Sequence, residues 1–336
     1  MKVSFECVDG HTAGMPVRMV VSGAPDLQGA DQSERRQHFI HEFDWIRRAL
    51  MFEPRGHSAM SGSIIYPPSS DDFDMGVIYI ETTGSLPMCG HGTIGTATFA
   101  LERGLVTPKV EGLLRLETPA GRVDVQYVRD GDKVTTAKLI NVPSFLMYQD
   151  VQIESSDLGL LKVDIAYGGN FYPIIERQEH FNDINDFDAS SLIQMGIRLR
   201  ETIEDTCDIT HPLDASISGL RHCMWTGQPI DASSDARGCV IAGEMIDRSP
   251  CGTGTSARLA QRVAKGLLDI GAPFVHESYI GSVFTGTAEE KTAVGEYDAI
   301  IPGISGSAHI TGLNTCLLYT SPSPRDLSTS RMPSSA

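Results

Sequence analysis

Short runs rich in apolar and β-branched residues recur along the chain, which is the pattern of β-strands. They are bounded by Gly, Pro or Asp and include SGSIIYPP (61–68), MGVIYI (75–80), LLRLET (113–118), RVDVQYV (122–128) and TTAKLINV (135–142). One longer stretch, from about Gln32 to Phe52, has apolar residues on one helical face and Pro54 after its end, which predicts a helix. The chain is therefore predicted to be a mixed α/β (α+β) protein.

Two further segments each predict a helix that starts at a cysteine. LPMCGHGTIGTATFALERGLV spans residues 86–106, and RSPCGTGTSARLAQRVAKGLL spans residues 248–268. Aligned on Cys89 and Cys251, they share two glycines, a threonine, and a later glycine (Gly104 or Gly266) where a helix would end. The first of these helices is apolar on almost every side, which predicts that it is buried within a domain.

These segments belong to a longer internal repeat. The two cysteines are separated by an offset of 162 residues, and ETPAGRV (117–123) resembles ESYIGSV (277–283) at an offset of 160. A weaker pair, AGMPVRMVV (13–21) and GNFYPIIE (169–176), precedes them in the same order. We interpret this as two copies of one α/β unit, each a curved sheet around a central helix; chance similarity of glycine-rich turns is the alternative.

Length, net charge, apolar runs and cysteine spacing exclude several classes of protein. A length of 336 residues favours two domains, and the net charge of −16 argues against a nucleic-acid partner. No apolar run approaches the roughly 20 residues that span a bilayer, and the first residues contain no apolar signal segment. The seven cysteines lack Cys-x-x-Cys or Cys/His ligand spacing, so neither a zinc site nor a disulfide framework is expected. A cytoplasmic protein with reduced thiols and no membrane contact is predicted.

A cysteine at the start of each of two helices is suited to proton transfer. A helix N-terminus offers free N–H groups and the positive end of the helix dipole, which lower the pKa of a thiol and bind a carboxylate. Two such thiols on opposite sides of a bound amino acid can invert its Cα, because one removes a proton while the other adds one. This reaction needs no cofactor if hydrogen-bond donors stabilise the charge that develops on the carboxylate.

Both cysteine segments are similar to the active-site signatures of the proline racemase family. DGHTAGMPVRMV, EPRGHSAMSGSIIYPP, GGNFY and HESYIGSVFTG also resemble family blocks, and the match runs from about residue 5 to 315. The resemblance implies a pseudo-symmetric, two-domain fold of the diaminopimelate-epimerase type, with the active site between the domains. It further implies a small-molecule substrate, proline or a hydroxyproline, without cofactor or metal, and a homodimer at the level of the family.

Carried over residue by residue, the resemblance assigns a site. Cys89 and Cys251 are its catalytic pair. The groups that would bind the substrate carboxylate are the backbone N–H groups of Gly90, His91, Gly252 and Thr253. The side chains that would contact the ring nitrogen are His91 and Asp247. Ser61 replaces an aromatic residue of proline-specific members, and His222 aligns with hydroxyproline-epimerising ones; both are predicted to bind a ring hydroxyl, unless they merely face solvent.

The predicted reaction is therefore epimerisation of trans-4-hydroxy-L-proline to cis-4-hydroxy-D-proline. The alternatives are proline racemisation, dehydration of trans-3-hydroxy-L-proline, and amino-acid binding by a catalytically inactive chain. Dehydratases of the family typically carry threonine at the second cysteine, so Cys251 favours inversion.

The predicted domains divide the chain into two halves and a tail. Residues 1–147 with 299–315 form the half that carries Cys89, and residues 148–298 form the half that carries Cys251. The remainder, 316–336, begins CLLYTSPSPRD, which resembles a translated transposon-end sequencing adapter. We therefore predict that residues 316–336 are non-native or disordered and contribute nothing to the fold.

Overall fold

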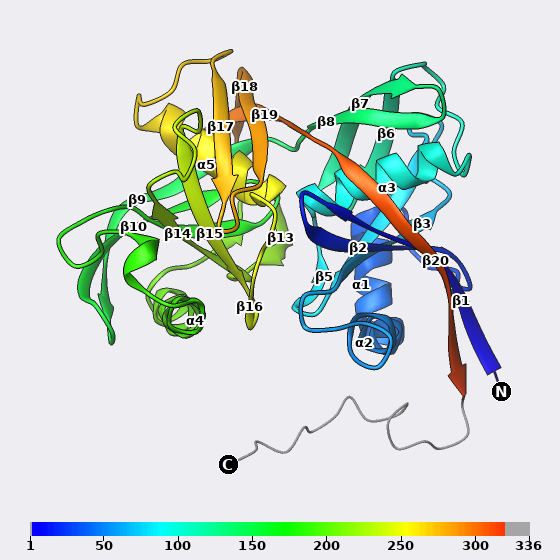
Figure 1. Ribbon diagram of the computed structural model, residues 1–336, viewed down its shortest axis with the longest axis horizontal. Helices are drawn as coiled ribbons and strands as arrows, with labels where there is room; N and C mark the ends of the chain where they lie inside the picture. The colour runs from blue at the N-terminus through cyan, green and yellow to red at the C-terminus, as the bar shows by residue number, and fades with distance from the viewer. Residues whose placement is uncertain (1, 320–336) are drawn as a thin grey trace.

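The structure, a computed structural model, describes residues 2–319. It is organised around two buried helices, each surrounded by strands that curve around it. Helix α3 (Gly90–Glu102) is buried from its first residue to Leu101 and lies among strands near both ends of the chain. Helix α5 (Gly252–Ala264) lies in the same way among strands of the middle of the chain. The strands around both helices belong to one continuous 18-stranded sheet, whose two curved halves form lobes that lie side by side (Figure 1).

The strands around α3 come from the first 140 residues and from the end of the described chain. They are β1 (Lys2–Thr12), β2 (Met15–Ser22), β3 (Ser61–Tyr66), β4 (Met75–Glu81), β5 (Gly84–Leu86), β6 (Leu113–Thr118), β7 (Gly121–Asp130), β8 (Lys133–Ile140) and β20 (Ala308–Tyr319). The strands of the second lobe are β9 (Ser144–Ser155), β10 (Gly159–Tyr167), β11 (Phe171–Ile175), β14 (His222–Gly227), β15 (Ala236–Ala242), β16 (Met245–Ile246), β17 (Pro273–Ser278), β18 (Val283–Val294) and β19 (Tyr297–Gly306).

Strand pairing confirms the predicted repeat. In the first lobe the neighbours run β20-β1-β2-β3-β4-β6-β7-β8, with parallel pairs only at β2–β3 and β4–β6. In the second lobe they run β9-β10-β11-β14-β15-β17-β18-β19, with parallel pairs only at β11–β14 and β15–β17. The same succession of parallel and antiparallel pairs in both lobes confirms a pseudo-symmetric α/β fold, because chance similarity of turns would not reproduce it.

Further helices occupy matching places outside the two curved halves of this sheet. Between β2 and β3 lie α1 (Gln32–His38), a π-helical segment η1 (Phe39–Phe43) and α2 (Asp44–Met51). Together they confirm the helix predicted from about Gln32 to Phe52, although the π-helical turn in its middle was not predicted. Between β11 and β14 lie the 3-10 turn η2 (Ile184–Asp186), helix α4 (Ala189–Thr206) and the hairpin of β12 (Thr210–His211) and β13 (Asp214–Ser218).

The chain passes between the lobes at two points. Strand β8 pairs with β19, and β9 follows at once as the first strand of the second lobe. Strand β19 pairs along its whole length with β18 before β20 crosses to β1. The predicted division after residue 147 falls inside β9, which begins at Ser144, and the one after residue 298 falls inside β19, which pairs with β18 as far as Ser305.

The predicted end of the fold near residue 315 is wrong. Strand β20 continues to Tyr319, and its last residues pair with the start of β1, with Cys316 opposite Phe5 and Leu318 opposite Val3. Cys316 and Leu318 are buried at 2% and 6% exposure. The alternation of inward and outward side chains continues through this segment, so it packs like the strand before it. The rest of the predicted tail, residues 320–336, lies outside the described residues.

Among residues 2–319, no helix combines the length and the apolar composition that crossing a membrane would require.

Candidate active site

The N-termini of the two central helices meet at the boundary between the lobes. A Cβ added to Gly90 would lie 2.4 Å from the Cα of Gly252, and one added to Gly252 would lie 2.7 Å from the Cα of Gly90. Only glycine permits this approach of one backbone to the other. The free N–H groups of both helices are thereby brought together, as the sequence predicted.

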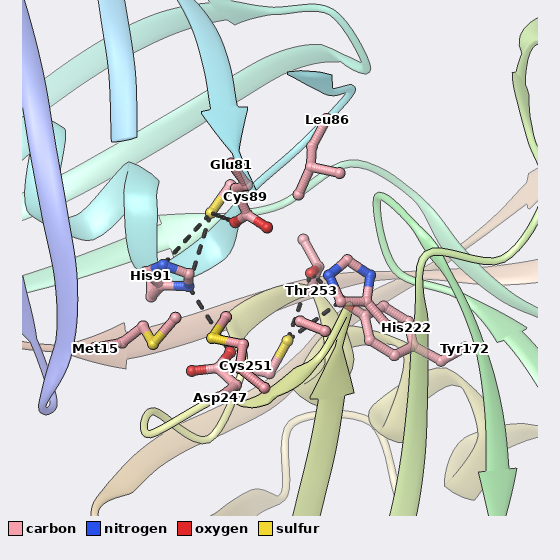
Figure 2. A pocket seen from close by; sticks show the side chains of 12 residues that line it. Met15, Glu81, Leu86, Cys89, His91, Tyr172, His222, Asp247, Cys251 and Thr253 are labelled. Atoms are coloured by element: carbon pink, nitrogen blue, oxygen red, sulfur yellow. Dashed lines mark hydrogen bonds and ion pairs between the residues drawn. The ribbon is translucent and has the colours of Figure 1, made fainter. Parts of the chain in front are cut away.

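Cys89 and Cys251 immediately precede these two helices and line one pocket (Figure 2). Neither side chain caps its own helix by a hydrogen bond, so both thiols are left to interact with the pocket. Its lining residues are Met15, Glu81, Leu86, Cys89, His91, Tyr172, His222, Ala242, Met245, Asp247, Cys251 and Thr253.

The backbone of Cys251 is strained. Its φ is +63° and its ψ is 100°, a conformation that non-glycine residues rarely adopt, whereas Cys89 is extended with a φ of −141°. A residue held in such a conformation costs of order 1–3 kcal/mol, and such residues cluster at functional sites. The strain therefore marks Cys251 as a residue whose position serves the pocket rather than the stability of the fold.

A buried carboxyl group lies directly against the first thiol. Cys89 Sγ donates to Glu81 Oε1 at 3.3 Å, and the Ser61 hydroxyl donates to the same oxygen at 3.0 Å. The imidazole nitrogens of His91 lie 3.7 and 3.8 Å from the same sulfur. Cys89 is therefore held between a hydrogen-bond acceptor and an imidazole.

Hydroxyl groups surround the second thiol. The Tyr172 hydroxyl lies 3.2 Å from Cys251 Sγ and 2.6 Å from the Thr253 hydroxyl. Asp247 stands nearby, but its Oδ1 accepts hydrogen bonds from the backbone N–H and the hydroxyl of Ser249, each at 2.8 Å. The other oxygen, Oδ2, lies 3.9 Å from Nδ1 of His91, which comes from the other lobe. His91 and Asp247 therefore approach each other across the pocket.

His222 presents an unpaired polar atom to the pocket. Its ring stacks on Tyr172 with centroids 5.1 Å apart, and its Nδ1 is buried without a hydrogen-bond partner among the described residues. Burial lowers the pKa of His222 to about 3, so the imidazole is neutral near pH 7. A neutral ring with a free nitrogen is suited to exchange a hydrogen bond with a polar ligand.

Burial raises the pKa of both thiols, contrary to the expectation that the helix N-termini would lower it. The backbone N–H groups of Gly92 and Gly254 act in the expected direction on Cys89 and Cys251. Loss of solvent and a nearby carboxyl group at each thiol outweigh them. A thiolate in this pocket therefore needs a cationic ligand beside it.

The site can now be compared with those of known proteins. The chain matches the proline racemase family over residues 7–324. It is 54% identical over 316 residues to a 4-hydroxyproline 2-epimerase of Ancylobacter novellus, covering 94% of this chain and 95% of that one. The chain belongs to the proline racemase family. The resemblance drawn from its motifs is thereby confirmed.

Solved structures of the family have the same fold. A hydroxyproline epimerase from Agrobacterium vitis with bound trans-4-hydroxy-L-proline superimposes with a TM-score of 0.86 at 28% identity, over 94% of this chain and 93% of that one. A probable proline racemase from Agrobacterium radiobacter K84 with bound carbonate gives a TM-score of 0.85 at 32% identity, over 92% of each chain. A predicted epimerase of Pseudomonas aeruginosa, at 13% identity and a TM-score of 0.57, shares the fold alone.

All of the predicted site residues lie at or beside this one pocket. Those that line it are Cys89, Cys251, His91, Asp247, Thr253 and His222. Gly90 and Gly252 begin the two helices, and Ser61 lies behind Cys89, fully buried. The alternative that Ser61 and His222 merely face solvent is therefore wrong.

Two polar residues that line the pocket, Glu81 and Tyr172, were not predicted. Glu81 ends an otherwise apolar strand, and Tyr172 belongs to the GGNFY block that was matched to the family without a role. An acid at the end of a strand with every residue buried is a signal that could have identified Glu81, because such a carboxyl group needs a partner. Tyr172 offered no comparable signal, since buried tyrosines are common in cores.

One set of side chains in this pocket is suited to a metal ion. Glu81, Cys89 and His91 each place a ligand-type atom within 4.8 Å of the other two, and within residues 2–319 no other set of His, Cys, Asp or Glu does so. Carboxylate, thiolate and imidazole are ligands of Zn²⁺. The predicted reaction needs no metal, so zinc would act here as a competitor of the proton on Cys89.

Added Zn²⁺ should therefore bind at Cys89. We expect calorimetry to detect one site, and Cys89→Ser to weaken binding by at least about tenfold because the thiolate ligand is lost. Cys207→Ser removes a partly exposed thiol outside the pocket and should leave binding unchanged. Equal affinity in Cys89→Ser and the unaltered protein would contradict this prediction.

Proposed function

We propose that this protein is a 4-hydroxyproline 2-epimerase that interconverts trans-4-hydroxy-L-proline and cis-4-hydroxy-D-proline without a cofactor. The observation that carries the proposal is the pair of buried thiols, one from each lobe, on a single pocket. The names of its relatives support it, as does the bound trans-4-hydroxy-L-proline in the Agrobacterium vitis structure.

The thiols act as an acid and a base on opposite faces of Cα. One, as thiolate, removes the Cα proton, while the other, as thiol, donates its proton to the other face. The positive ring nitrogen of the substrate supplies the charge that a buried thiolate requires. After one turnover the two cysteines have exchanged protonation states, and the reverse reaction starts from that form.

The helix N-termini hold the carboxylate on which negative charge develops. The backbone N–H groups that would bind it belong to Gly90, His91, Gly252 and Thr253. Donors fixed in advance by the glycine contact stabilise that charge without reorganising. The His91 and Asp247 side chains, 3.9 Å apart across the pocket, are placed to bind the ring nitrogen between them.

The ring hydroxyl is assigned to the side of the pocket that holds His222. The free Nδ1 of His222 gives it a partner that proline cannot use. Ser61 donates its own proton to Glu81, so it retains only acceptor capacity for a ligand. A site built to pair with a hydroxyl group rejects an analogue that lacks it, because its polar groups are then left unpaired.

Proton exchange in deuterated water tests the proposal. The protein is incubated with each candidate imino acid, and Cα deuteration and chirality are followed by NMR and chiral chromatography. Deuteration with inversion, fastest for 4-hydroxyproline, is expected. Faster inversion of proline would identify a proline racemase, and loss of water from trans-3-hydroxy-L-proline would identify a dehydratase. Binding of an imino acid without Cα deuteration would indicate a catalytically inactive binding protein.

His222→Ala should weaken recognition of hydroxyproline more than of proline. One neutral hydrogen bond contributes about 0.5–1.5 kcal/mol, so KM for hydroxyproline should rise roughly two- to tenfold. His180→Ala, at an exposed histidine outside the pocket, is the control. Equal effects of His222→Ala on the two substrates would show that this side chain does not bind the ring hydroxyl.

Ser61→Phe should shift the preference towards proline. The larger side chain would extend past Cys89 into the space assigned to the substituted ring. We expect the ratio of kcat/KM for hydroxyproline to that for proline to fall by about tenfold or more. A proportional loss with both substrates would mean that position 61 acts only through Glu81 and Cys89.

We also propose a cell compartment, from the state of the cysteines, and an assembly, from the family resemblance. All seven cysteines are free, and the mechanism needs two reduced thiols, which supports a cytoplasmic enzyme. A homodimer is proposed from the family resemblance, and sedimentation velocity would test it.

A further inference from the structure

The backbone that leads to Cys251 differs from the backbone that leads to Cys89, although the lobes repeat one fold. Ser249 stands two residues before Cys251, and Pro87 stands at the matching place before Cys89. Cys89 is extended with a φ of −141°, whereas Cys251 has a φ of +63°. Proline has neither a hydroxyl group nor an N–H group, so the first lobe cannot form the contacts that Ser249 forms in the second.

Ser249 links the side chain of Asp247 to the backbone of Cys251. Its hydroxyl oxygen accepts a hydrogen bond from the N–H of Cys251 at 3.1 Å, and its hydroxyl group donates to Oδ1 of Asp247 at 2.8 Å. The backbone N–H of Ser249 donates to the same Oδ1 at 2.8 Å. Because the N–H of Cys251 can only donate, the hydroxyl oxygen must accept from it, and its own proton is left for Asp247.

All three residues of this chain of hydrogen bonds are buried. Ser249 is 1% exposed, and Asp247 and Cys251 are each 4% exposed. A buried N–H group that loses its acceptor is costly, because water does not replace the lost partner. The conformation of Cys251 is one that non-glycine residues rarely adopt, and it persists only where the surroundings hold it. The hydrogen bond to Ser249 is such a restraint.

The restraint matters because the backbone of Cys251 sets the place of its sulfur. Sγ now lies 3.2 Å from the Tyr172 hydroxyl oxygen and 3.8 Å from that of Thr253, on the pocket. If φ relaxed to an ordinary negative value, the Cα–Cβ bond would point in another direction and the sulfur would move. Reacting atoms must approach to about 3–3.5 Å, so a small movement of the thiol slows proton transfer.

We propose that Ser249 is a positioning residue of the reaction, which holds Cys251 in its strained conformation and so keeps the thiol against one face of the substrate Cα. This inference rests on the proposed function, in which Cys251 transfers a proton at that face. Asp247 keeps the hydrogen bond from the backbone N–H of Ser249 when the hydroxyl group is removed. Loss of the hydroxyl group should therefore slow proton transfer and leave the binding of substrate nearly unchanged.

Steady-state kinetics of Ser249→Ala test this role. We expect kcat for 4-hydroxyproline to fall by about ten- to a hundredfold, since a displacement of about 1 Å can cost a factor of about 10². KM should stay within about threefold, because the groups assigned to the carboxylate and the ring nitrogen remain. Ser249→Thr keeps a hydroxyl group and should restore most of the lost kcat. A defect of folding alone would not separate kcat from KM in this way.

Ser155→Ala is the matched control. Ser155 is also buried, and its hydroxyl oxygen also accepts from backbone N–H groups shortly after it in the chain, those of Asp157 and Leu158. It lies at the turn between β9 and β10, outside the pocket. The same kind of hydrogen bond is therefore lost in both variants, but kcat and KM should be unchanged in Ser155→Ala.

Amide hydrogen exchange measures the contact itself without turnover. In protein that carries isotope-labelled cysteine, the NMR signal that is lost in Cys251→Ser belongs to the Cys251 amide. We expect this amide to be protected from exchange in the unaltered protein and to exchange at least about tenfold faster in Ser249→Ala. The amides of the other cysteines should stay within about twofold.

An unchanged kcat in folded Ser249→Ala would overturn the proposal, as would a rise in KM alone. A Cys251 amide that exchanges as fast as an unprotected one in the unaltered protein would also overturn it. If Ser249→Ala does not fold, Ser249→Cys fills the same space with a weak acceptor and replaces it in both measurements. An unaltered protein that inverts no imino acid would refute the proposed function, whereas normal turnover by Ser249→Ala in an active epimerase would refute only the role of Ser249.

Discussion

Replacing either Cys89 or Cys251 by serine should reduce epimerisation by a factor of about 10²–10⁴, the usual contribution of one acid–base group. Serine has nearly the same shape, but its hydroxyl group is a far weaker acid than a thiol. Inversion needs one group on each face of Cα, so loss of either cysteine should stop it. Initial rates measured by chiral chromatography in both directions would check this.

Both variants should remain folded and bind ligand, because the helix N-termini that hold the carboxylate are unchanged. Unchanged melting temperatures and retained binding of a substrate analogue would show this. Cys207→Ser, at the partly exposed thiol that ends α4, is the matched control and should retain full activity. Near-normal turnover by either Cys89→Ser or Cys251→Ser would exclude the two-thiol mechanism.

The sequence carried enough information for the repeat and for the main residues of the pocket. A cysteine before a glycine-rich helix start is a local pattern, and its recurrence at Cys251 identified the second half of the site. The glycines that follow each cysteine, Gly90 and Gly252, completed the pattern of a helix start with free N–H groups. Such features depend on neighbours in the sequence, so reading the sequence finds them.

The features that were missed depend on neighbours in space. Glu81 contacts Cys89 because β4 ends beside the start of α3, and no spacing in the sequence reveals that contact. The direction of the thiol pKa shifts was wrong for a related reason: the helix N-terminus is a local feature, whereas burial is a property of the whole fold. Close pairing of the last strand with the first, at Cys316 and Phe5, is equally non-local.

The second large expected effect is on stability, and it comes from shortening strand β20. Removing residues 316–336 should destabilise the protein more than removing residues 320–336, and the difference reports residues 316–319 alone. Those four residues pair with the first residues of β1, and two of them, Cys316 and Leu318, pack in the cluster that contains Phe5. Burying a leucine side chain stabilises a fold by about 1.5–3 kcal/mol.

We therefore expect the shorter chain to melt several degrees lower, since about 1 kcal/mol shifts the midpoint by roughly 2–4 °C in domains of 150–250 residues. Loss of the pairing also leaves the edge of β1 open, so the shorter chain should aggregate sooner on heating. Leu317→Ala alters a side chain on the other face of β20 and should have a smaller effect than Leu318→Ala, because Leu318 is the one that packs in this cluster. Equal melting temperatures for the two truncations would contradict the assignment of residues 316–319 to the fold. The family match, which extends to residue 324, agrees with that assignment.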